Sequence, residues 1–393
     1  LIHVDSITQQ PTNMSTTTPI LFFTRWITHL CAPTFVFLAG TSAYLAFKNS
    51  SNLSESRSFL IKRGIWLIIL EFTVVNFAIW FDLGFHIFIF EVIAAIGFGF
   101  IILGLLLNLK PTTLGLIGLI IIFGHNLFPL IPFGEGSIIR AILTPLFGST
   151  AIPITANTTF IMGYPPIPWL GIMLVGFAAG KFFEMESERR KSLFLKIGFG
   201  SLLLFVVLRF INIYGDSVPW TYQANAIYPF LSFNNITKYP PSLLFCLTTL
   251  GVMFLLLAFA ETAKNKFTDI ALTYGRVPLF YFLVHFYLIH LLLLAVLFLQ
   301  GFSFSQFEFA SGTFGRPKGV SSGLDLWVIY LIWLGVVAAM YPLCRWFGKY
   351  KSEHKEKAWL RYLSRATIIK NYEIFGDTNF VDFDSMFCSN AIR

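Results

Sequence analysis

The sequence predicts an all-α protein, a polytopic bundle of about nine transmembrane helices. Of its 393 residues, 56% are hydrophobic and only 12% are charged, and the mean hydropathy is +0.72. A soluble globular domain carries roughly 25% charged residues, so this chain lacks the polar surface that water requires. Apolar segments long enough to cross a bilayer recur along the chain, and the basic residues gather between them on one side.

Turn and charge signals bound each apolar segment. Lys110-Pro111 separates the third segment from the fourth, and the proline-rich end of the fourth predicts a broken helix. A helix needs roughly 20 residues to cross the hydrocarbon core. In chain order, the predicted spans are 20–46, 59–81, 85–108, 112–133, 166–183, 192–212, 240–260, 271–299 and 326–348.

The distribution of basic residues predicts the orientation of the bundle. If residues 1–19 lie outside, 22 of the 28 lysines and arginines fall in cytoplasmic segments, 4 fall in outer segments and 2 lie within helices. This asymmetry follows the positive-inside rule and places the C-terminus in the cytoplasm. The net charge of +8 is then a topology signal, which argues against a nucleic-acid partner.

Three regions are expected along the chain: an extracytoplasmic segment over 1–19, the transmembrane bundle over 20–349 and a cytoplasmic tail over 350–393. The tail is basic at first, which favours contact with anionic membrane lipid, and polar towards its end. Its last 30 or so residues are expected to form a loosely ordered extension without function, and the alternative is a regulatory role. No signal peptide precedes the first long helix, and the first residue is Leu1, so the chain is expected to start at an internal position of a longer protein.

The cysteines and histidines give no pattern of a metal site. The four cysteines are widely spaced and form no CxxC pair, which argues against zinc and against a disulfide framework. No HExxH motif occurs, and His285 and His290, five residues apart, lie about 140° from each other around a helix. The chain also lacks phosphate-binding loops and a GxSxG elbow. No metal is therefore expected.

Ionisable residues inside the apolar segments mark candidate functional positions, because charge is costly at membrane depth. With a rise of about 1.5 Å per residue, His29, His125 and His290 fall in the outer half of the membrane. Glu91 falls near the outer start of its helix. A neutral imidazole there suits a general base for a hydroxyl or amine nucleophile. A single buried histidine is more often a packing residue, so the gathering of several on one side carries the hypothesis.

Three other ionisable residues have more than one interpretation. Glu71 and His285 fall near the middle of the membrane. Arg25 either reaches the outer interface with its head group or pairs with Glu71 or Glu91. Alternatively, Glu71 or Glu91 orients a histidine instead of pairing with Arg25.

Several strings together resemble the bacterial membrane proteins of the heparan-alpha-glucosaminide N-acetyltransferase catalytic-domain family, within the transmembrane acyltransferase superfamily. The resemblance covers about residues 1–363. Most of its strings also have a plain explanation as helix starts, turns or interfacial aromatics. The strings are RWITHLCAP at 25–33 followed by FVFLAG at 35–40, GHN at 124–126, YPPIPWLG at 164–171, YGD at 214–216, KYPPSL at 238–243, GRVPLF at 275–280 and YPLC at 341–344.

This resemblance implies a membrane-bound acyltransferase of a bacterial inner membrane. Acetyl-CoA is the implied co-substrate on the cytoplasmic side, and an extracytoplasmic sugar or glycan receives the acyl group. The competing interpretations are a transporter or flippase and a non-catalytic membrane fragment, and a homo-oligomer is compatible with any of them. The catalytic candidates are His125, His290, His29 and Glu91, and the candidates for substrate binding are Arg25, Asn126, Asp216, Lys238 and Arg276.

The resemblance also includes departures. Relatives in the bacterial branch begin with one more helix, which ends in an Asp-His pair, so this chain is expected to lack that helix. The lysosomal enzyme of the family has an acidic residue where His29 aligns. His125 and Asn126 match the motif of the bacterial branch.

Overall fold

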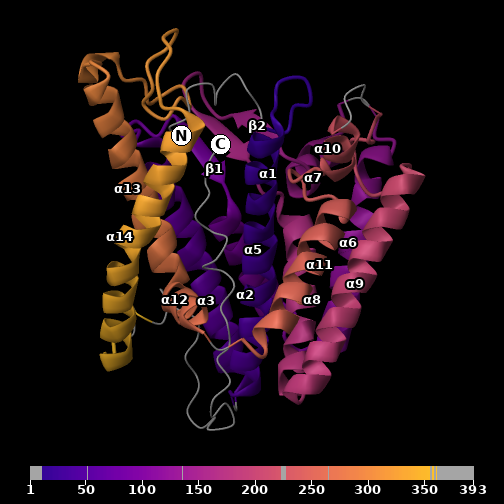
Figure 1. Cartoon of the computed structure of the whole chain (residues 1–393). Coiled ribbons are helices and arrows are strands. Elements are labelled where there is room, and N and C mark those ends of the chain that lie inside the picture. Colours follow the sequence, from indigo (N-terminus) through magenta and orange to yellow (C-terminus); the bar gives the residue numbers. More distant parts are fainter. Residues whose placement is uncertain are drawn as a thin grey trace.

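The computed structural model describes residues 11–360, apart from 51, 135, 223–226, 264, 355 and 358–359. The predicted final tail, 364–393, lies outside the described residues. Most helices run side by side along one direction, with a small sheet at one end (Figure 1). The elements are α1 (Pro19–Ile27), η1 (Thr28–Leu30), α2 (Cys31–Lys48), α3 (Leu53–Leu70), η2 (Glu71–Val75), α4 (Asn76–Trp80), β1 (Ile87–Phe90), α5 (Val92–Leu105), α6 (Pro111–Gly124), η3 (His125–Leu130), α7 (Ile138–Phe147), β2 (Thr150–Pro153), β3 (Thr159–Met162), α8 (Pro166–Ala179), η4 (Gly180–Glu184), α9 (Ser187–Ile211), α10 (Tyr228–Asn234), α11 (Leu243–Ala260), α12 (Lys266–Gly275), α13 (Pro278–Leu299), η5 (Phe304–Gln306) and α14 (Leu326–Glu353).

Seven helices within the described residues are long and apolar enough to cross a membrane, which confirms the predicted all-α polytopic membrane fold. The other two predicted spans also contain helix. The span predicted at 59–81 belongs to a continuous helical run through α3, η2 and α4, in which η2 is a π-helix. The span predicted at 85–108 is different, because its start forms strand β1 and its helix α5 has 14 residues.

The strand at the start of this segment has a physical reason in the sheet. β1 pairs in parallel with β3, which pairs antiparallel with β2, so β3 is the central strand. The β-branched and aromatic residues of Ile87–Phe90 suit either a strand or a buried helix. Their hydrogen-bonding partner comes from a segment about 70 residues further along the chain, which local pattern does not reveal.

Several helices are interrupted where the sequence contains a polar residue or a proline. The 3-10 turn η1 separates α1 from α2 and contains His29. α6 gives way to the 3-10 helix η3 at His125, which confirms the predicted break in this span. Arg276 and Val277 separate α12 from α13, since Pro278 starts a new helix and lacks the N–H that would continue the old one.

Glycines allow the closest helix crossings. A Cβ atom on Gly40 of α2 would lie 2.1 Å from the carbonyl oxygen of Met173, and one on Gly176 of α8 would lie 2.1 Å from that of Phe37. The backbones of α2 and α8 are therefore in direct contact, as is usual where membrane helices pack through small residues. Gly64 on α3 and Gly97 on α5 make a similar crossing.

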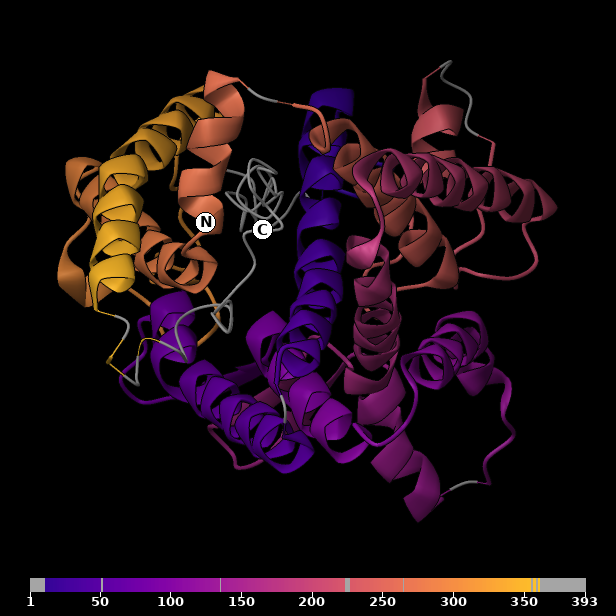
Figure 2. The ribbon, with the colours of Figure 1, turned by 90° about the horizontal axis from the view of Figure 1, so that it is seen from below.

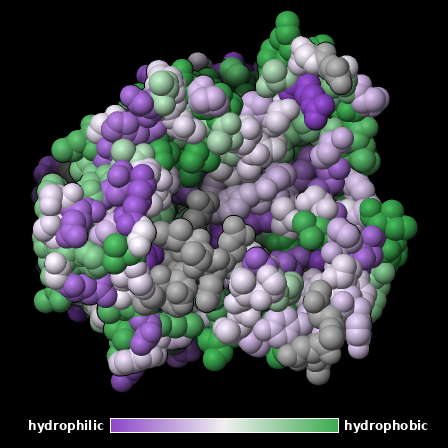
Figure 3. Space-filling model, turned by 90° about the horizontal axis from the view of Figure 1, so that it is seen from above, coloured by the Kyte–Doolittle hydropathy of each residue, from purple (hydrophilic) through white to green (hydrophobic). Residues whose placement is uncertain are grey.

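The helices form two packing units. The large hydrophobic core joins α2, α3, α5, α8, α9 and α11, whereas α12, α13 and α14 share separate smaller cores. Seen along the bundle, α13 and α14 stand on the side opposite α9 (Figure 2). We call the end with the strands the sheet end. Its face carries many hydrophilic side chains, with hydrophobic ones gathered at several places along the edge (Figure 3).

Candidate functional site

A cavity of about 120 Å³ lies where the two packing units meet, near the sheet end. We call it the polar chamber. It is bounded by the η1–α2 junction, the end of α4, the β1–α5 junction, the segment before α11, and α13. Its polar lining consists of Arg25, Thr28, Glu91, Tyr164, Lys238, Tyr239 and His285. Ionisable groups of both signs and an imidazole therefore converge within an otherwise apolar bundle.

Two cations belong to this lining. The Arg25 guanidinium, at the end of α1, donates a hydrogen bond of 3.3 Å to the hydroxyl of Thr28. The Lys238 ammonium lies over two aromatic rings, 5.0 Å from the centroid of Tyr239 and 5.7 Å from that of Tyr164. A tyrosine face attracts a cation through its quadrupole, which helps to keep this ammonium at the chamber. Together the two cations suit an electron-rich or anionic oxygen.

Acidic groups lie at the start of α5. Glu91 lines the chamber and is the N-cap residue of α5. Behind it Glu71, fully buried in the π-helix η2, accepts a hydrogen bond of 2.8 Å from the backbone N–H of Ala94 through Oε2. Its other oxygen has no hydrogen-bond partner. Glu71 thus satisfies a free N–H of the first turn of α5 and fixes the helix that presents Glu91. π-Helical turns of this kind are frequent at functional sites.

The imidazole of the chamber is His285 on α13, which is 1% exposed. Its Nδ1 lies 3.0 Å from the carbonyl oxygen of Tyr281, one turn earlier, and its Nε2 has no partner. A hydrogen bond from Nδ1–H to a carbonyl selects the tautomer in which Nε2 carries the lone pair. This is the arrangement of a general base.

His285 was only one of several mid-membrane residues in the sequence and was not among the predicted catalytic residues. Its sequence surroundings resemble those of the other helical histidines, so only the rule that intramembrane ionisable residues are functional pointed to it. The tyrosines at 164 and 239 were visible in the sequence as parts of proline-rich strings. Phe314, which also lines the chamber, gave no signal; its ring stacks on Trp80 at 4.9 Å.

The structure brings together three of the predicted site residues, Arg25, Glu91 and Lys238, and places the others elsewhere. His29 is buried in η1 next to Thr28, and its ring meets Phe245 edge-on at 5.5 Å. His290 is fully buried and stacks on Phe81 with ring centroids 3.9 Å apart. Neither lines the chamber. Their catalytic roles stay predictions.

The remaining predicted residues lie at other loops. His125 and Asn126 contact the start of α11, and Asp216 contacts the segment before it. Arg276 is exposed between α12 and α13, where its carbonyl oxygen accepts a hydrogen bond of 3.0 Å from Lys351 Nζ. The described part of the chain contains no group of three or more metal-ligating side chains. Among the described cysteines, Cys246 and Cys344 are free and buried.

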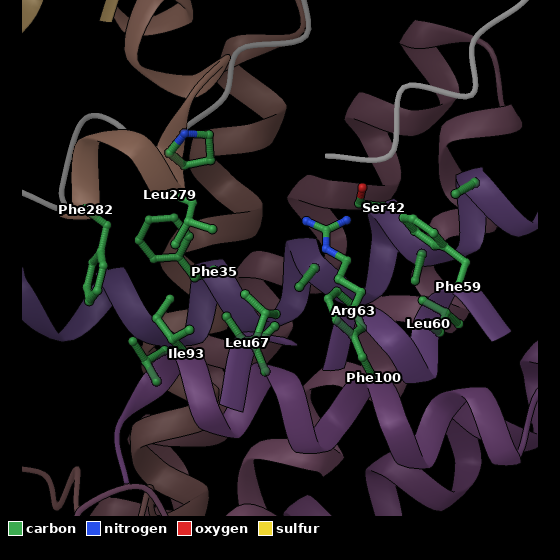
Figure 4. A pocket seen from close by; sticks show the side chains of 16 residues that line it. Phe35, Ser42, Phe59, Leu60, Arg63, Leu67, Ile93, Phe100, Leu279 and Phe282 are labelled. Atoms are coloured by element: carbon green, nitrogen blue, oxygen red, sulfur yellow. The ribbon is translucent and has the colours of Figure 1, made fainter. Parts of the chain in front are cut away.

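A second cavity of about 110 Å³, which we call the apolar groove, adjoins the chamber. Figure 4 shows its side chains, which come from α2, α3, α5 and the start of α13. Phe35, Val92 and Phe282 line both cavities. The lining is apolar except for Ser42 and Arg63, whose guanidinium lies over the ring of Phe100 at 5.3 Å.

One face of α2 lines both cavities in succession. Cys31, Ala32 and Phe35 border the chamber, and Phe35, Ala39, Ser42 and Ala46 border the groove. Their spacing of three to four residues is that of one helical face. From Cys31 to Ala46 the helix rises about 22 Å, which is most of the roughly 30 Å hydrocarbon core. The two cavities therefore follow each other across the membrane.

The fold and the chamber define the class: a polytopic membrane protein with a polar chamber buried in its helix bundle. The family model described as Heparan-alpha-glucosaminide N-acetyltransferase, catalytic, matches residues 6–214, just over half of the chain, so the chain belongs to this family. The membership confirms the resemblance to this family over residues 6–214 and implies membrane acyltransferase activity. Searches of the curated proteins and of the solved structures found no match.

Proposed function

We propose that the protein moves an acyl group, typically acetyl, from cytoplasmic acyl-CoA to a hydroxyl or amine of a sugar or glycan on the other side of the membrane. The observation that carries this proposal is the succession of the two cavities along α2. A polar chamber holds a base, a carboxylate and two cations, and a groove leads from it towards the opposite end of the bundle. Membership of an N-acetyltransferase family supports acetyl-CoA as the donor.

The proposed donor site is the apolar groove. The acyl-bearing arm of acyl-CoA is thin and largely uncharged up to its phosphates, which suits a narrow apolar passage with few polar groups. Arg63 and Ser42 are the groups there that offer hydrogen bonds to the arm. The thioester would lie near Phe35 and Phe282, where the groove meets the chamber.

In the proposed reaction, Nε2 of His285 accepts the proton of the acceptor hydroxyl or amine as its oxygen or nitrogen attacks the thioester carbonyl carbon. Arg25 and Lys238 stabilise the negative charge that develops on the carbonyl oxygen. As the intermediate collapses, the carbon–sulfur bond breaks and the proton passes from His285 to the departing sulfur. Glu91 attracts an amine acceptor or accepts hydrogen bonds from sugar hydroxyls.

The proposed orientation puts the sheet end outside and the C-terminus of α14 in the cytoplasm of a bacterial cell, with the inner membrane as the location. Its support is the excess of lysine and arginine in the segments assigned to the inside. A cysteine-accessibility assay on intact cells tests it. A cysteine introduced at exposed Thr155 should react with a membrane-impermeant maleimide, whereas one introduced at exposed Lys349 should not.

The function is tested by incubating the purified protein, in lipid nanodiscs, with acetyl-CoA and glucosamine and measuring the release of the CoA thiol. We expect release that depends on both compounds, and stabilisation against heat by acetyl-CoA that free CoA competes away. Neither turnover nor stabilisation at millimolar acetyl-CoA would overturn the acyltransferase proposal. Stabilisation without turnover would keep the donor and reject glucosamine as the acceptor.

A further inference from the structure

The segment between α10 and α11 carries Lys238 and Tyr239 into the polar chamber. A lysine side chain is flexible, with four rotatable bonds, so the place of its ammonium depends on how firmly its backbone is held. This backbone segment has no regular secondary structure. Polar side chains from three other parts of the chain hold it instead.

Asp216 holds the segment on both sides of Lys238. Its carboxylate accepts hydrogen bonds from the backbone N–H of Thr237 at 2.9 Å, from the Thr237 hydroxyl at 2.6 Å and from the Ser242 hydroxyl at 2.6 Å. A fourth, from the N–H of Val218 at 3.0 Å, ties the carboxylate to its own turn. The Ser242 hydroxyl in turn accepts from the N–H of Phe245 and caps α11.

Arg209, at the end of α9, holds the part of the chain before Lys238. It is 1% exposed. Its guanidinium donates four hydrogen bonds of 2.8–3.0 Å to backbone carbonyl oxygens, those of Val218, Ser232, Phe233 and Asn235. A guanidinium has five N–H donors in a rigid fork, so it can join several loop carbonyls at once.

His125 and Asn126, at the start of η3, hold the part after Lys238. Nε2 of His125 lies 2.7 Å from the carbonyl oxygen of Pro241, and Oδ1 of Asn126 accepts a hydrogen bond of 2.9 Å from the N–H of Leu243. Nδ1 of His125 lies 3.0 Å from the carbonyl oxygen of Ile121. Both ring nitrogens of His125 thus face backbone carbonyls.

We propose that Asp216 is a positioning residue for Lys238, and that Arg209, His125 and Asn126 complete the same anchor. Of these four residues, Asp216 is the one whose single carboxylate contacts both Thr237, directly before Lys238, and Ser242, shortly after it. The anchor keeps the ammonium over Tyr164 and Tyr239 at the chamber wall. This inference rests on the proposed function only for its kinetic consequence, since the position of Lys238 can be measured without turnover.

The kinetic test is a double-mutant cycle with acetyl-CoA and glucosamine. We expect Asp216→Asn to lower kcat/KM about tenfold in the natural background and less than about twofold in a Lys238→Ala background, because a residue that acts only through another has no further effect once that one is removed. Ser242→Ala, which removes one hydrogen bond to the Asp216 carboxylate together with the cap of α11, should show the same dependence with a smaller effect. Equal losses in both backgrounds would overturn the proposal.

Glu261 offers a matched control. It is also a largely buried carboxylate with several donors, accepting from Arg190 Nε at 2.5 Å, from a second Arg190 nitrogen at 2.6 Å and from the Ser187 hydroxyl at 2.9 Å. These contacts join α9 to the end of α11, away from the chamber. Glu261→Gln should lower heat stability and reduce kcat/KM by the same factor with or without Lys238. If Glu261→Gln shows the pattern expected of Asp216→Asn, the cycle reports general destabilisation and the proposal fails.

A second measurement needs no turnover. Brief treatment of the full-length protein with acetic anhydride, followed by mass spectrometry, reports the reactivity of Lys238 relative to exposed Lys110. Asp216→Asn should raise the labelling of Lys238 several-fold, leave Lys110 unchanged and speed hydrogen exchange at the Thr237 amide. Unchanged Lys238 labelling would overturn the positioning role. Increased labelling in a protein that shows neither turnover nor stabilisation by acetyl-CoA would leave this inference standing and reject the proposed function alone.

Discussion

The polar chamber and the apolar groove are neighbours of similar size on one face of α2, yet their linings differ in polarity. The chamber collects an imidazole, a carboxylate and two cations, whereas the groove has Ser42 and Arg63 among aliphatic and aromatic side chains. The difference follows from the segments that close them. Helix faces close the groove, while turns and helix ends, where polar groups find backbone partners, close much of the chamber. In the proposed function, the chemistry therefore takes place in the chamber and the arm of acyl-CoA binds in the groove.

The largest expected effect separates chemistry from binding. His285→Ala should lower the rate of thiol release from acetyl-CoA by about 10²–10⁴-fold, the usual contribution of a general base, with unchanged stabilisation by acetyl-CoA. His290→Ala, five residues along the same helix and outside the chamber, tests the other catalytic candidate on α13, and an equal loss there would show that the chamber does not single out the base. If His285→Ala kept the natural rate, His285 would not be the general base.

Blocking the groove should have the opposite profile. In Ala39→Phe, the new ring on α2 would occupy the groove, so we expect the KM for acetyl-CoA to rise about tenfold, the cost of roughly 1.4 kcal/mol of lost binding. Ala338→Phe on the exposed side of α14 adds the same ring without touching either cavity. Calorimetric titration with acetyl-CoA measures the difference. Equal affinities in the two variants would show that the donor binds elsewhere.

A smaller effect should come from the border that the cavities share. Phe282 lines both, so Phe282→Ala would enlarge the junction where we place the thioester. One or two extra methylenes in an apolar site change selectivity by about 10–200-fold, and a partly open site lies at the low end. The ratio of rates with butyryl-CoA and acetyl-CoA should rise several-fold. Phe59→Ala, which widens only the groove, should leave that ratio nearer its natural value.

The smallest expected effect is a change in how heat stability depends on pH. Asp82 follows α4, whose end lines the chamber, and it accepts hydrogen bonds from the N–H of Gly84 and from the N–H and ring of His86. Burial raises the pKa of this carboxyl, but these hydrogen bonds outweigh burial and hold its pKa below the usual value.

A depressed pKa contributes stability above the unfolded value of about 3.9, and that stability is lost as pH falls through the folded pKa. Between about pH 5 and pH 3 the melting temperature should fall more for the natural protein than for Asp82→Asn. Parallel curves would contradict this account. Because Asp82 lines neither cavity, acetyl-CoA binding in the groove should respond to acid equally in both proteins.

Part of the site could be predicted from the sequence. Arg25 and Glu91 stood out because charged residues at the ends of apolar helices need a reason, and Lys238 because it lies in a string of the family resemblance. The sequence named His125 as a catalytic candidate and left His285 out, although each is a lone histidine in an apolar helix. The hydrogen bond from η3 to the segment before α11 makes His125 an anchor, and the position of α13, packed against α4 and α14, brings His285 to the chamber.

The sequence by itself determined that this protein lies in a lipid bilayer and where most of its helices lie. A run of some 20 apolar residues forms a helix in lipid because its backbone must satisfy its own hydrogen bonds, and this is a local property. The break at His125 was predicted from the proline-rich end of its span, whereas the predicted span 271–299 is wrong in running across the break before Pro278. Only the tertiary structure decided that Ile87–Phe90 is a strand and that Arg25, Glu91, Lys238 and His285 share one chamber. Both depend on partners 70 to 260 residues apart in the chain, and contacts over such separations leave no periodic pattern in a single sequence.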